Sequence, residues 1–311
     1  MDLHPDQLEA LRVVVDRGTF EAAARSLHVT PSAISQRMKA LESAVGRVLL
    51  QRSKPVVLTE SGQVVLRLAR QFALLQSDAD RALAGDADAA RVTSIPLAVN
   101  ADSLSTWVLP ALAPLAVSHG LVFDIYREDQ AFSTELLRRG TVMGAITSEA
   151  DAVQGCTVRP IGRMRYRPMA TPAFVERWLG GNATAGTPAS TLTSDLSRAP
   201  MVIFDRRDTL QHDYLASRVT SDGADGTGNA PLGPPAHFIP ASVDYAEAVQ
   251  LGLGWGMLPH AQADAPEALG TIVEIDPGAF IEVPLYWQQW KLESEALAAI
   301  AAALEKAAPQ L

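Results

Sequence analysis

Cysteine, long apolar runs and a surplus of positive charge are all missing or scarce in this 311-residue sequence. The single cysteine, Cys156, cannot form an internal disulfide, so we expect the reducing cytoplasm as the compartment. No apolar run approaches the roughly 20 residues of a membrane-spanning helix. The first residues also lack the basic and apolar regions of a signal peptide. We therefore expect no membrane partner.

Enzyme signatures are missing as well. The sequence has no Gly-x-Ser-x-Gly nucleophile elbow, no P-loop and no His-Glu-x-x-His zinc motif. Its six histidines are scattered, and Cys156 has no partner at a readable spacing. We expect no catalytic residue, no metal and no cofactor, and a structural role for Cys156.

The net charge of −9 is unusual for a protein that binds nucleic acid, so we compare the charges of two parts of the chain. Residues 1–60 hold 8 Lys and Arg against 7 Asp and Glu, whereas residues 61–311 hold 18 against 28. The acidic surplus thus lies outside the first 60 residues. Because even those residues are nearly neutral, local pattern has to decide whether they bind DNA.

The first 60 residues carry the start and stop signals of three helices. Residues 5–16 predict a first helix that Gly18 ends, and Thr19 can cap a short second helix. After a short break Thr30 can cap a third helix, with Pro31 at its first position, where a missing N–H costs nothing. Two helices separated by a tight break are typical of a helix-turn-helix.

The third helix divides into an apolar and a polar face. Ile34, Met38 and Leu41 share the inward face. A helix that enters the major groove needs small residues for close approach and side chains that pair with base edges. A merely solvated face is the alternative, which the short helix and tight break make less favoured. The candidate DNA-binding residues of this segment are Thr30, Pro31, Ser32, Ser35, Gln36, Arg37 and Lys39.

Residues 48–59 predict two short strands around a basic turn, the wing of a winged helix. Arg52 and Lys54 in this turn can neutralise phosphates or reach a minor groove, although cations in a turn can also serve solubility alone.

A long helix is predicted from about residue 60 to residue 83. Its apolar residues alternate by three and four, which favours a dimerisation seam over a helix packed only on its own domain. Residues 84–89 are expected to form a hinge. The seam residues are Val65, Leu68, Phe72, Leu75, Ala79 and Ala82.

From Arg91 onward strands alternate with helices, which predicts βαβ units and a mostly parallel sheet. Loops are expected at 180–194 and 220–235. The expected strands are 92–99, 121–127, 142–147, 200–204 and 284–288, and the expected helices are 107–119, 133–139, 243–251 and 292–307.

The segments 18–24 and 27–42, the wing residues 49–52 and the run 58–62 together resemble the LysR-type transcriptional regulators. More narrowly, residues 30–37 and 100–107 are similar to the LysG/ArgP subgroup, which controls lysine and arginine exporters. The resemblance covers essentially the whole chain.

The resemblance implies an α+β multidomain fold. A winged helix-turn-helix (1–59) would be followed by a linker helix and hinge (60–90) and a two-lobed α/β effector domain like periplasmic binding proteins (91–311). Lobe I would comprise 92–165 and 269–311, and lobe II 166–268. It further implies a homodimer that assembles to a homotetramer, an operator in double-stranded DNA, and contact with RNA polymerase.

Within the resemblance, the DNA-reading positions are matched by Pro31, Ser32, Ser35 and Gln36, with Arg52 on the wing. Many relatives carry Arg where Gln36 stands. Because Arg favours guanine and Gln favours adenine, the operator sequence of those relatives cannot be transferred.

Effector candidates follow from where strands end, since ligands bind outside the carboxyl ends of strands in an open α/β sheet. A helix start with hydroxyl donors favours a carboxylate, and acidic residues favour a cation. Helix capping, turns and solvated acidic surfaces are the alternatives for these residues. The set suits lysine or arginine, and comprises Asn100, Ala101, Asp102, Ser103, Ser105, Thr106, Trp107, Glu128, Asp129, Thr147, Asp205 and Ser242.

Three functions remain open from these observations. The first is a regulator that activates an amino-acid exporter gene when lysine or arginine is abundant. The second is an architectural or replication-modulating DNA-binding protein, and the third is a LysR-type regulator with another small-molecule effector. Effector binding is expected to close the two lobes and re-angle the DNA-binding pairs.

Overall fold

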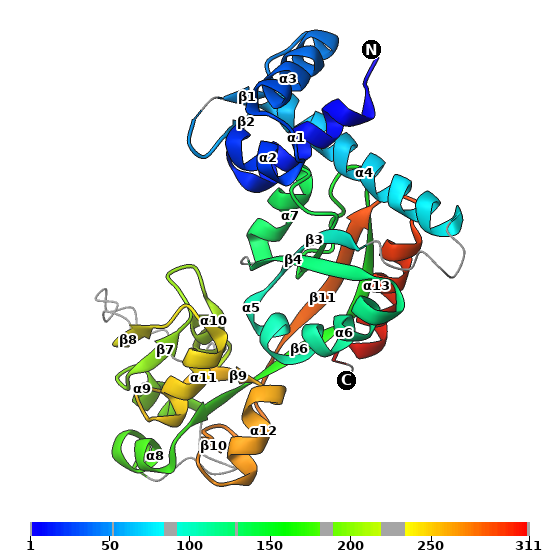
Figure 1. Cartoon of the computed structure of the whole chain (residues 1–311). Helices are drawn as coiled ribbons and strands as arrows, with labels where there is room; N and C mark the ends of the chain where they lie inside the picture. The colour runs from blue at the N-terminus through cyan, green and yellow to red at the C-terminus, as the bar shows by residue number, and fades with distance from the viewer. Residues whose placement is uncertain are drawn as a thin grey trace. The chain divides into compact units, whose positions relative to one another are not determined.

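The computed structural model describes residues 2–51, 53–83, 92–127, 130–180, 189–218 and 234–309 (Figure 1). The chain divides into two compact units. The first comprises Met1–Asn100, Pro110–Ile161 and Tyr286–Ala307, and the second comprises Ala101–Leu109, Gly162–Leu285 and Ala308–Leu311. The second unit contains four segments that were expected in lobe I, namely 101–109, 162–165, 269–285 and 308–311.

The N-terminal part of the first unit is a winged helix-turn-helix, as predicted. Its elements are α1 (Pro5–Arg17), α2 (Phe20–Ser26), α3 (Pro31–Val45), β1 (Leu50–Gln51) and β2 (Val57–Leu58). Gly18 ends α1 in the left-handed region with a φ of 73°, which glycine adopts without steric cost. The two wing strands pair antiparallel.

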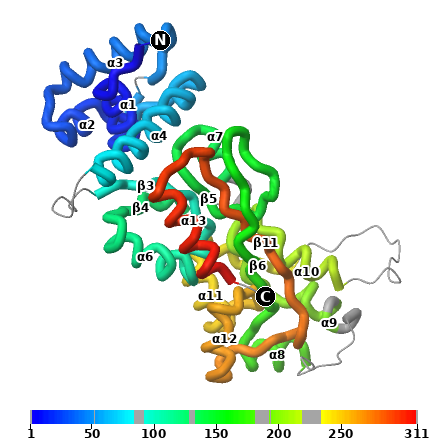
Figure 2. Tube along the Cα trace, turned by 90° about the vertical axis from the view of Figure 1, so that its right-hand side faces the viewer, coloured from blue at the N-terminus to red at the C-terminus, as the bar shows by residue number. Residues whose placement is uncertain are grey.

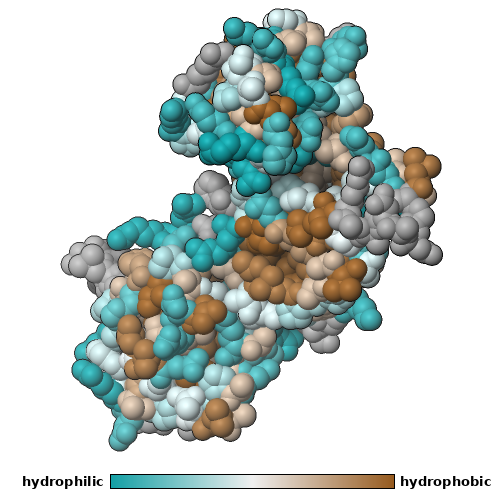
Figure 3. All heavy atoms as spheres, in the orientation of Figure 1, coloured by the Kyte–Doolittle hydropathy of each residue, from teal (hydrophilic) through white to brown (hydrophobic). Residues whose placement is uncertain are grey.

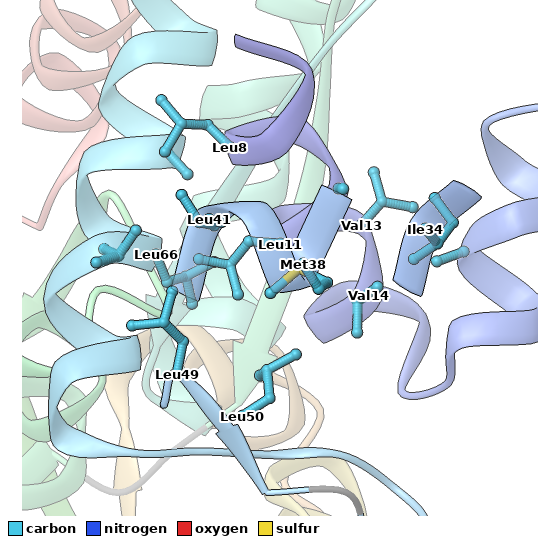
Figure 4. Packing of buried hydrophobic residues seen from close by; sticks show 14 of the residues in the cluster. Leu8, Leu11, Val13, Val14, Ile34, Met38, Leu41, Leu49, Leu50 and Leu66 are labelled. Atoms are coloured by element: carbon cyan, nitrogen blue, oxygen red, sulfur yellow. The ribbon is translucent and has the colours of Figure 1, made fainter. Parts of the chain in front are cut away.

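One apolar core holds these elements together, and Figure 4 shows side chains from α1, α3, β1 and α4 converging on it. The predicted inward residues of α3 are all buried: Ile34 and Leu41 are fully inaccessible, and Met38 is nearly so. Since α1 and α3 pack on each other through this core, the orientation of α3 follows that of α1.

The linker helix α4 (Glu60–Leu83) has the predicted bounds. Five of the six seam residues are exposed, but Val65 is buried in the helix-turn-helix core, so its place in the seam was wrong. Val64, one residue earlier, is exposed in its place. The unpartnered stripe on α4 therefore consists of Val64, Leu68, Phe72, Leu75, Ala79 and Ala82.

The sheet of the first unit has parallel pairs at one side only. β3 (Thr93–Val99) pairs in parallel with β4 (Leu121–Arg127) and β5 (Gly144–Thr147). β11 (Ile281–Trp290) then pairs antiparallel with β5, so this part of the sheet is mixed, with an antiparallel pair beside the predicted parallel ones. The helices that accompany these strands are α6 (Leu109–Ser118), α7 (Gln130–Arg138) and α13 (Glu295–Ala307), the last shown again in Figure 2.

The second unit contains elements that the sequence analysis did not foresee. The 15-residue strand β6 (Cys156–Ala170) enters it and pairs antiparallel with β9 (Gly256–Pro259) and β10 (Val273–Glu274). β7 (Met201–Ile203) and β8 (Ala236–Phe238) form a separate parallel pair. The helices of this unit are α8 (Pro172–Leu179), α9 (Ala189–Leu196), α10 (Leu210–Arg218), α11 (Ser242–Gln250) and α12 (His260–Ala268).

The expected hinge and loops can be compared with the structure only in part. The expected loop 180–194 was wrong at its end, because α9 begins at Ala189. The segments 84–89 and 220–233 lie outside the described residues. Among the helices that the structure describes, none combines the length and the apolar character needed to cross a bilayer.

Candidate functional site

The start of α3 is built by local capping. Thr30 Oγ1 accepts a hydrogen bond of 3.1 Å from the Ala33 N–H, and Pro31 occupies the first turn. Thr19 caps α2 in the same way, accepting from Ala22 N–H at 3.1 Å. Both caps stabilise the first turns of the second and third helices and so define where these helices begin.

The polar face of α3 lies at the surface. Ser32, Gln36 and Lys39 are exposed, whereas Ser35 is half-buried. Ser35 lines a cavity of about 220 Å³ between α2, α3 and the wing, which Lys54 also lines. A side chain there can still meet a nucleic acid that enters between the helix and the wing.

The cations of this region are not equivalent. Arg37 donates to Asp6 of α1 at 3.1 Å, which gives it a partner within the protein. Lys54 is exposed on the wing, and Arg52 lies outside the described residues. Figure 3 shows mostly hydrophilic side chains on one face of this domain.

The segment that follows β3 is helical rather than a loop. α5 (Ala101–Ser103) continues into a π-helical turn, η2 (Leu104–Val108), and then into α6. The predicted helix start at Trp107 was therefore wrong by six residues. Asp102 lies within the first helical turn and belongs to the second unit.

Asp102 accepts two hydrogen bonds from side chains of the same unit. Ser242 Oγ donates to Oδ1 at 2.6 Å, and Tyr166 Oη donates to Oδ2 at 2.8 Å. Burial, followed by the negative charge of Asp102, raises the pKa of Tyr166 well above its usual value, so Tyr166 stays a donor. A carboxylate offers about four acceptor positions, so Asp102 keeps capacity for a further donor.

Ser242 does not cap a helix, which was the alternative interpretation of this residue. It is the first residue of α11, whose cap position is Ala241 without a side-chain hydrogen bond. Its hydroxyl instead joins Asp102 and Ser105, whose Oγ lies 2.9 Å away. The structure thus brings Asp102, Ser105 and Ser242 together from distant parts of the sequence.

Gln262 of α12 completes this group, and sequence analysis missed it. Its Nε2 donates to Ser242 Oγ at 2.8 Å and to Ser105 Oγ at 3.1 Å. A lone Gln on a helix gives no local signal. We call Asp102, Ser105, Tyr166, Ser242 and Gln262 the Asp102 cluster.

Several polar groups on and beside the cluster have no hydrogen-bond partner in the described part of the chain. They are Gln262 Oε1, Ser103 Oγ and Trp107 Nε1, all of them buried atoms. Buried polar groups normally find partners, so these three atoms stand out in the second unit.

Asp205 was predicted as an effector-binding residue, but the neighbouring Asp208 is the carboxyl group that interacts with the Asp102 cluster. The Asp205 carboxylate accepts from the N–H groups of Arg207 and Asp208 at 2.7 and 3.1 Å, which organises a turn. Asp208, which was not predicted, has a raised pKa, chiefly because it is buried and further because Asp102 and Asp205 add negative charge. The Asp102 cluster therefore lies within the field of a second carboxyl group.

The remaining candidates have other placements. Asn100 and Thr147 belong to the first unit and are not members of the Asp102 cluster. Thr147 Oγ1 accepts from Glu149 N–H at 3.0 Å, and Thr106 Oγ1 donates to the Asp102 carbonyl at 2.6 Å, which are local backbone roles. Ala101 begins α5. Glu128 and Asp129 lie outside the described residues.

A winged helix-turn-helix followed by a long helix and an α/β part is the architecture of a DNA-binding transcription regulator. Residues 5–63 match the family described as the bacterial regulatory helix-turn-helix proteins of the lysR family. The chain is 42% identical to the lysine export transcriptional regulatory protein LysG of Corynebacterium efficiens, over 98% of each chain.

Solved structures agree over the full length. A crystal structure of ArgP from Mycobacterium tuberculosis aligns with a TM-score of 0.80 and 40% identity, covering 100% of this chain and 99% of that one. Full-length LysG from Corynebacterium glutamicum with the effector Arg bound aligns with a TM-score of 0.72 and 36% identity, covering 98% and 97%. The chain belongs to the LysR-type transcriptional regulators, in the group of LysG and ArgP.

Proposed function

We propose that the chain binds lysine or arginine at the Asp102 cluster and thereby controls transcription of an amino-acid export gene. The observation that carries this proposal is a carboxylate, Asp102, with spare acceptor capacity in a group that also holds Gln262, whose Oε1 has no hydrogen-bond partner among the described residues. The names of the relatives, and the arginine in one of their structures, support the same ligand class.

The chemistry of the cluster favours a cation. A guanidinium or ammonium donates charge-assisted hydrogen bonds to a carboxylate, and these are stronger than bonds between neutral groups. Burial is the main reason that the pKa of Asp208 is raised, and the negative charge of Asp102 adds to it. A positive ligand would relieve this second effect. A purely anionic metabolite would be repelled by the same two groups.

The DNA-binding role rests on α3. Its exposed Ser32, Gln36 and Lys39 combine base-pairing groups with a cation, and Lys54 on the wing can reach phosphates. We propose a two-fold symmetric operator as the DNA partner. We further propose that the protein works in the cytoplasm and contacts RNA polymerase there.

Self-association through exposed apolar surface completes the proposal. The unpartnered stripe on α4 suits a second copy of this chain, since a symmetric operator is read by a dimer. Val117 of α6 and Val122 of β4 are also exposed, and Figure 3 shows apolar side chains gathered in the region where Figure 1 places these elements. We propose that this second surface joins dimers into a tetramer.

Titration calorimetry of the full-length protein tests the ligand class. We expect binding of L-arginine or L-lysine, and loss of binding with L-citrulline and L-norleucine, which replace the side-chain cation by neutral groups. Asp102→Asn should abolish binding, because it removes the charge and keeps the shape.

Asp244→Asn is the matched control, since Asp244 is an exposed carboxylate on the same helix as Ser242. It should bind as the wild type does. Equal affinity for arginine and citrulline, or unchanged binding by Asp102→Asn, would refute the proposed site.

A further inference from the structure

Among the ion pairs of the described residues in the first unit, the most deeply buried cation is Arg70 of α4, whose side chain is only 5% exposed. One guanidinium nitrogen donates to Asp16 of α1 at 2.6 Å, and another donates to the carbonyl of Gly140, which follows α7, at 2.9 Å. Arg70 thus joins a helix of the DNA-binding domain, the linker helix and the effector part of the same chain.

Arginine is the side chain suited to such a junction. Its planar guanidinium presents several donors in a fixed geometry, so one group can bind a carboxylate and a carbonyl that lie in different directions. A buried charge is tolerated only when it is paired and hydrogen-bonded. Arg70 therefore keeps both of its partners only while α1, α4 and the loop at Gly140 hold their relative positions.

The neighbouring turn of α4 makes a second close contact with the same loop. Gly140 has a φ of 68°, and a side chain there would place its Cβ only 2.7 Å from Cβ of Arg67. The Arg67 guanidinium in turn lies over the ring of Trp290, 4.6 Å from its centre. α4 is therefore held against the effector part by contacts at two successive turns.

Space for a rearrangement lies directly beside this contact. A cavity of about 240 Å³ is lined by Arg12, Asp16, Arg70 and Asp124, with Ser77 and Thr93 among its other polar residues. A fully packed junction would leave the Arg70 side chain no space to move, whereas a polar cavity beside it leaves room for a second arrangement.

We propose that Arg70 is a positioning residue through which the effector part sets the orientation of the DNA-binding domain. Because α1 carries Asp16 and packs on α3, a shift of the Gly140 loop moves α3 through Arg70. This inference rests on the proposed function, in which an amino acid changes operator binding. It adds the route by which that change reaches α3.

The test measures the operator affinity of the full-length protein with and without saturating L-arginine, together with the arginine affinity by calorimetry. Couplings between sites commonly amount to about 5- to 150-fold. In Arg70→Gln we expect arginine and operator each to bind, while the ratio of the two operator affinities falls toward one. Arg138→Gln removes an exposed cation of α7, also close to Gly140 in sequence, and should keep the wild-type ratio.

Two further variants keep the inference testable if Arg70→Gln does not fold. Asp16→Asn removes the ion pair from the α1 side, and Gly140→Ala pushes the loop away from Arg67 without changing any charge. Both should lower the ratio as well. A full wild-type ratio in the folded variants would overturn the role of Arg70.

Amide hydrogen exchange separates this inference from the proposed function. In Arg70→Gln the segments 5–17 and 136–144 should lose protection together, while α2 keeps its own. If the wild type does not respond to arginine, the proposed ligand fails, and the exchange pattern alone decides whether Arg70 couples the two parts. Unchanged exchange in both segments would then overturn it.

Discussion

Among single residues, Gln36 has the sharpest expected effect on operator choice, because it is exposed on α3 and an amide can pair with both major-groove groups of adenine. Gln36→Ala should weaken specific binding by about 1–3 kcal/mol and relax the preference at one base position. Lys39→Gln should instead weaken binding to all sequences evenly and reduce the salt dependence. Competition binding with single-base operator variants distinguishes the two, and an unchanged base preference in Gln36→Ala would contradict its role.

Asp208 gives a pH prediction whose sign follows from its raised pKa. The folded protein holds the Asp208 proton more tightly than the unfolded chain does. Its contribution to stability is therefore complete below the ordinary Asp pKa and is lost as the pH rises through the raised value. The free energy of unfolding, measured with denaturant, should fall as the pH rises from the ordinary Asp pKa through the raised value. This fall should be smaller in Asp208→Asn than in the wild type. Identical profiles would exclude Asp208 as the source.

The residues of the Asp102 cluster show where sequence reasoning ends. Asp102, Ser105 and Ser242 could be proposed from their places after strands or at helix starts, which are local signals. Tyr166 and Gln262 could not, because only the packed fold brings them to Asp102. Asp205 was favoured over Asp208 because it follows a strand directly, yet its carboxylate is used by the turn.

At the scale of elements, prediction succeeded where capping and periodicity act locally. The helix-turn-helix and α4 were found from Thr19, Thr30 and the apolar spacing. β6 was missed although Met164, Tyr166 and Pro168 alternate with arginines, because its two prolines and one glycine are unusual within a strand. The antiparallel pairing of β11 depends on partners far along the chain, which no local pattern encodes.

The stripe on α4 gives a prediction that belongs to the element. Phe72 is 38% exposed in the middle of the stripe, so Phe72→Glu would place a charge in an apolar helix–helix contact. We expect sedimentation to show dissociation of the dimer, with helical content unchanged by circular dichroism. Phe72→Leu keeps an apolar side chain at the same position without adding a charge, and should leave the dimer intact. A Phe72→Glu protein that sediments as the wild type does would contradict the stripe as the interface.

At the scale of the whole molecule, the distribution of charge matches the division of labour. The acidic surplus lies beyond the first 60 residues, where a positive ligand is proposed to bind, while the nearly neutral DNA-binding domain relies on a few placed side chains. Regulation requires that the ligand prefer one arrangement of the molecule over another, since equal affinity for both would shift neither.

Operator binding by the wild type and by Asp102→Asn, each followed as L-arginine or L-lysine is added, is the most direct measurement. We predict that the wild-type affinity or footprint changes with these amino acids and not with L-citrulline. Asp102→Asn should bind the same operator and ignore all three. An operator complex that is indifferent to every amino acid, or that responds equally in both proteins, would contradict the assignment of the Asp102 cluster as the sensor.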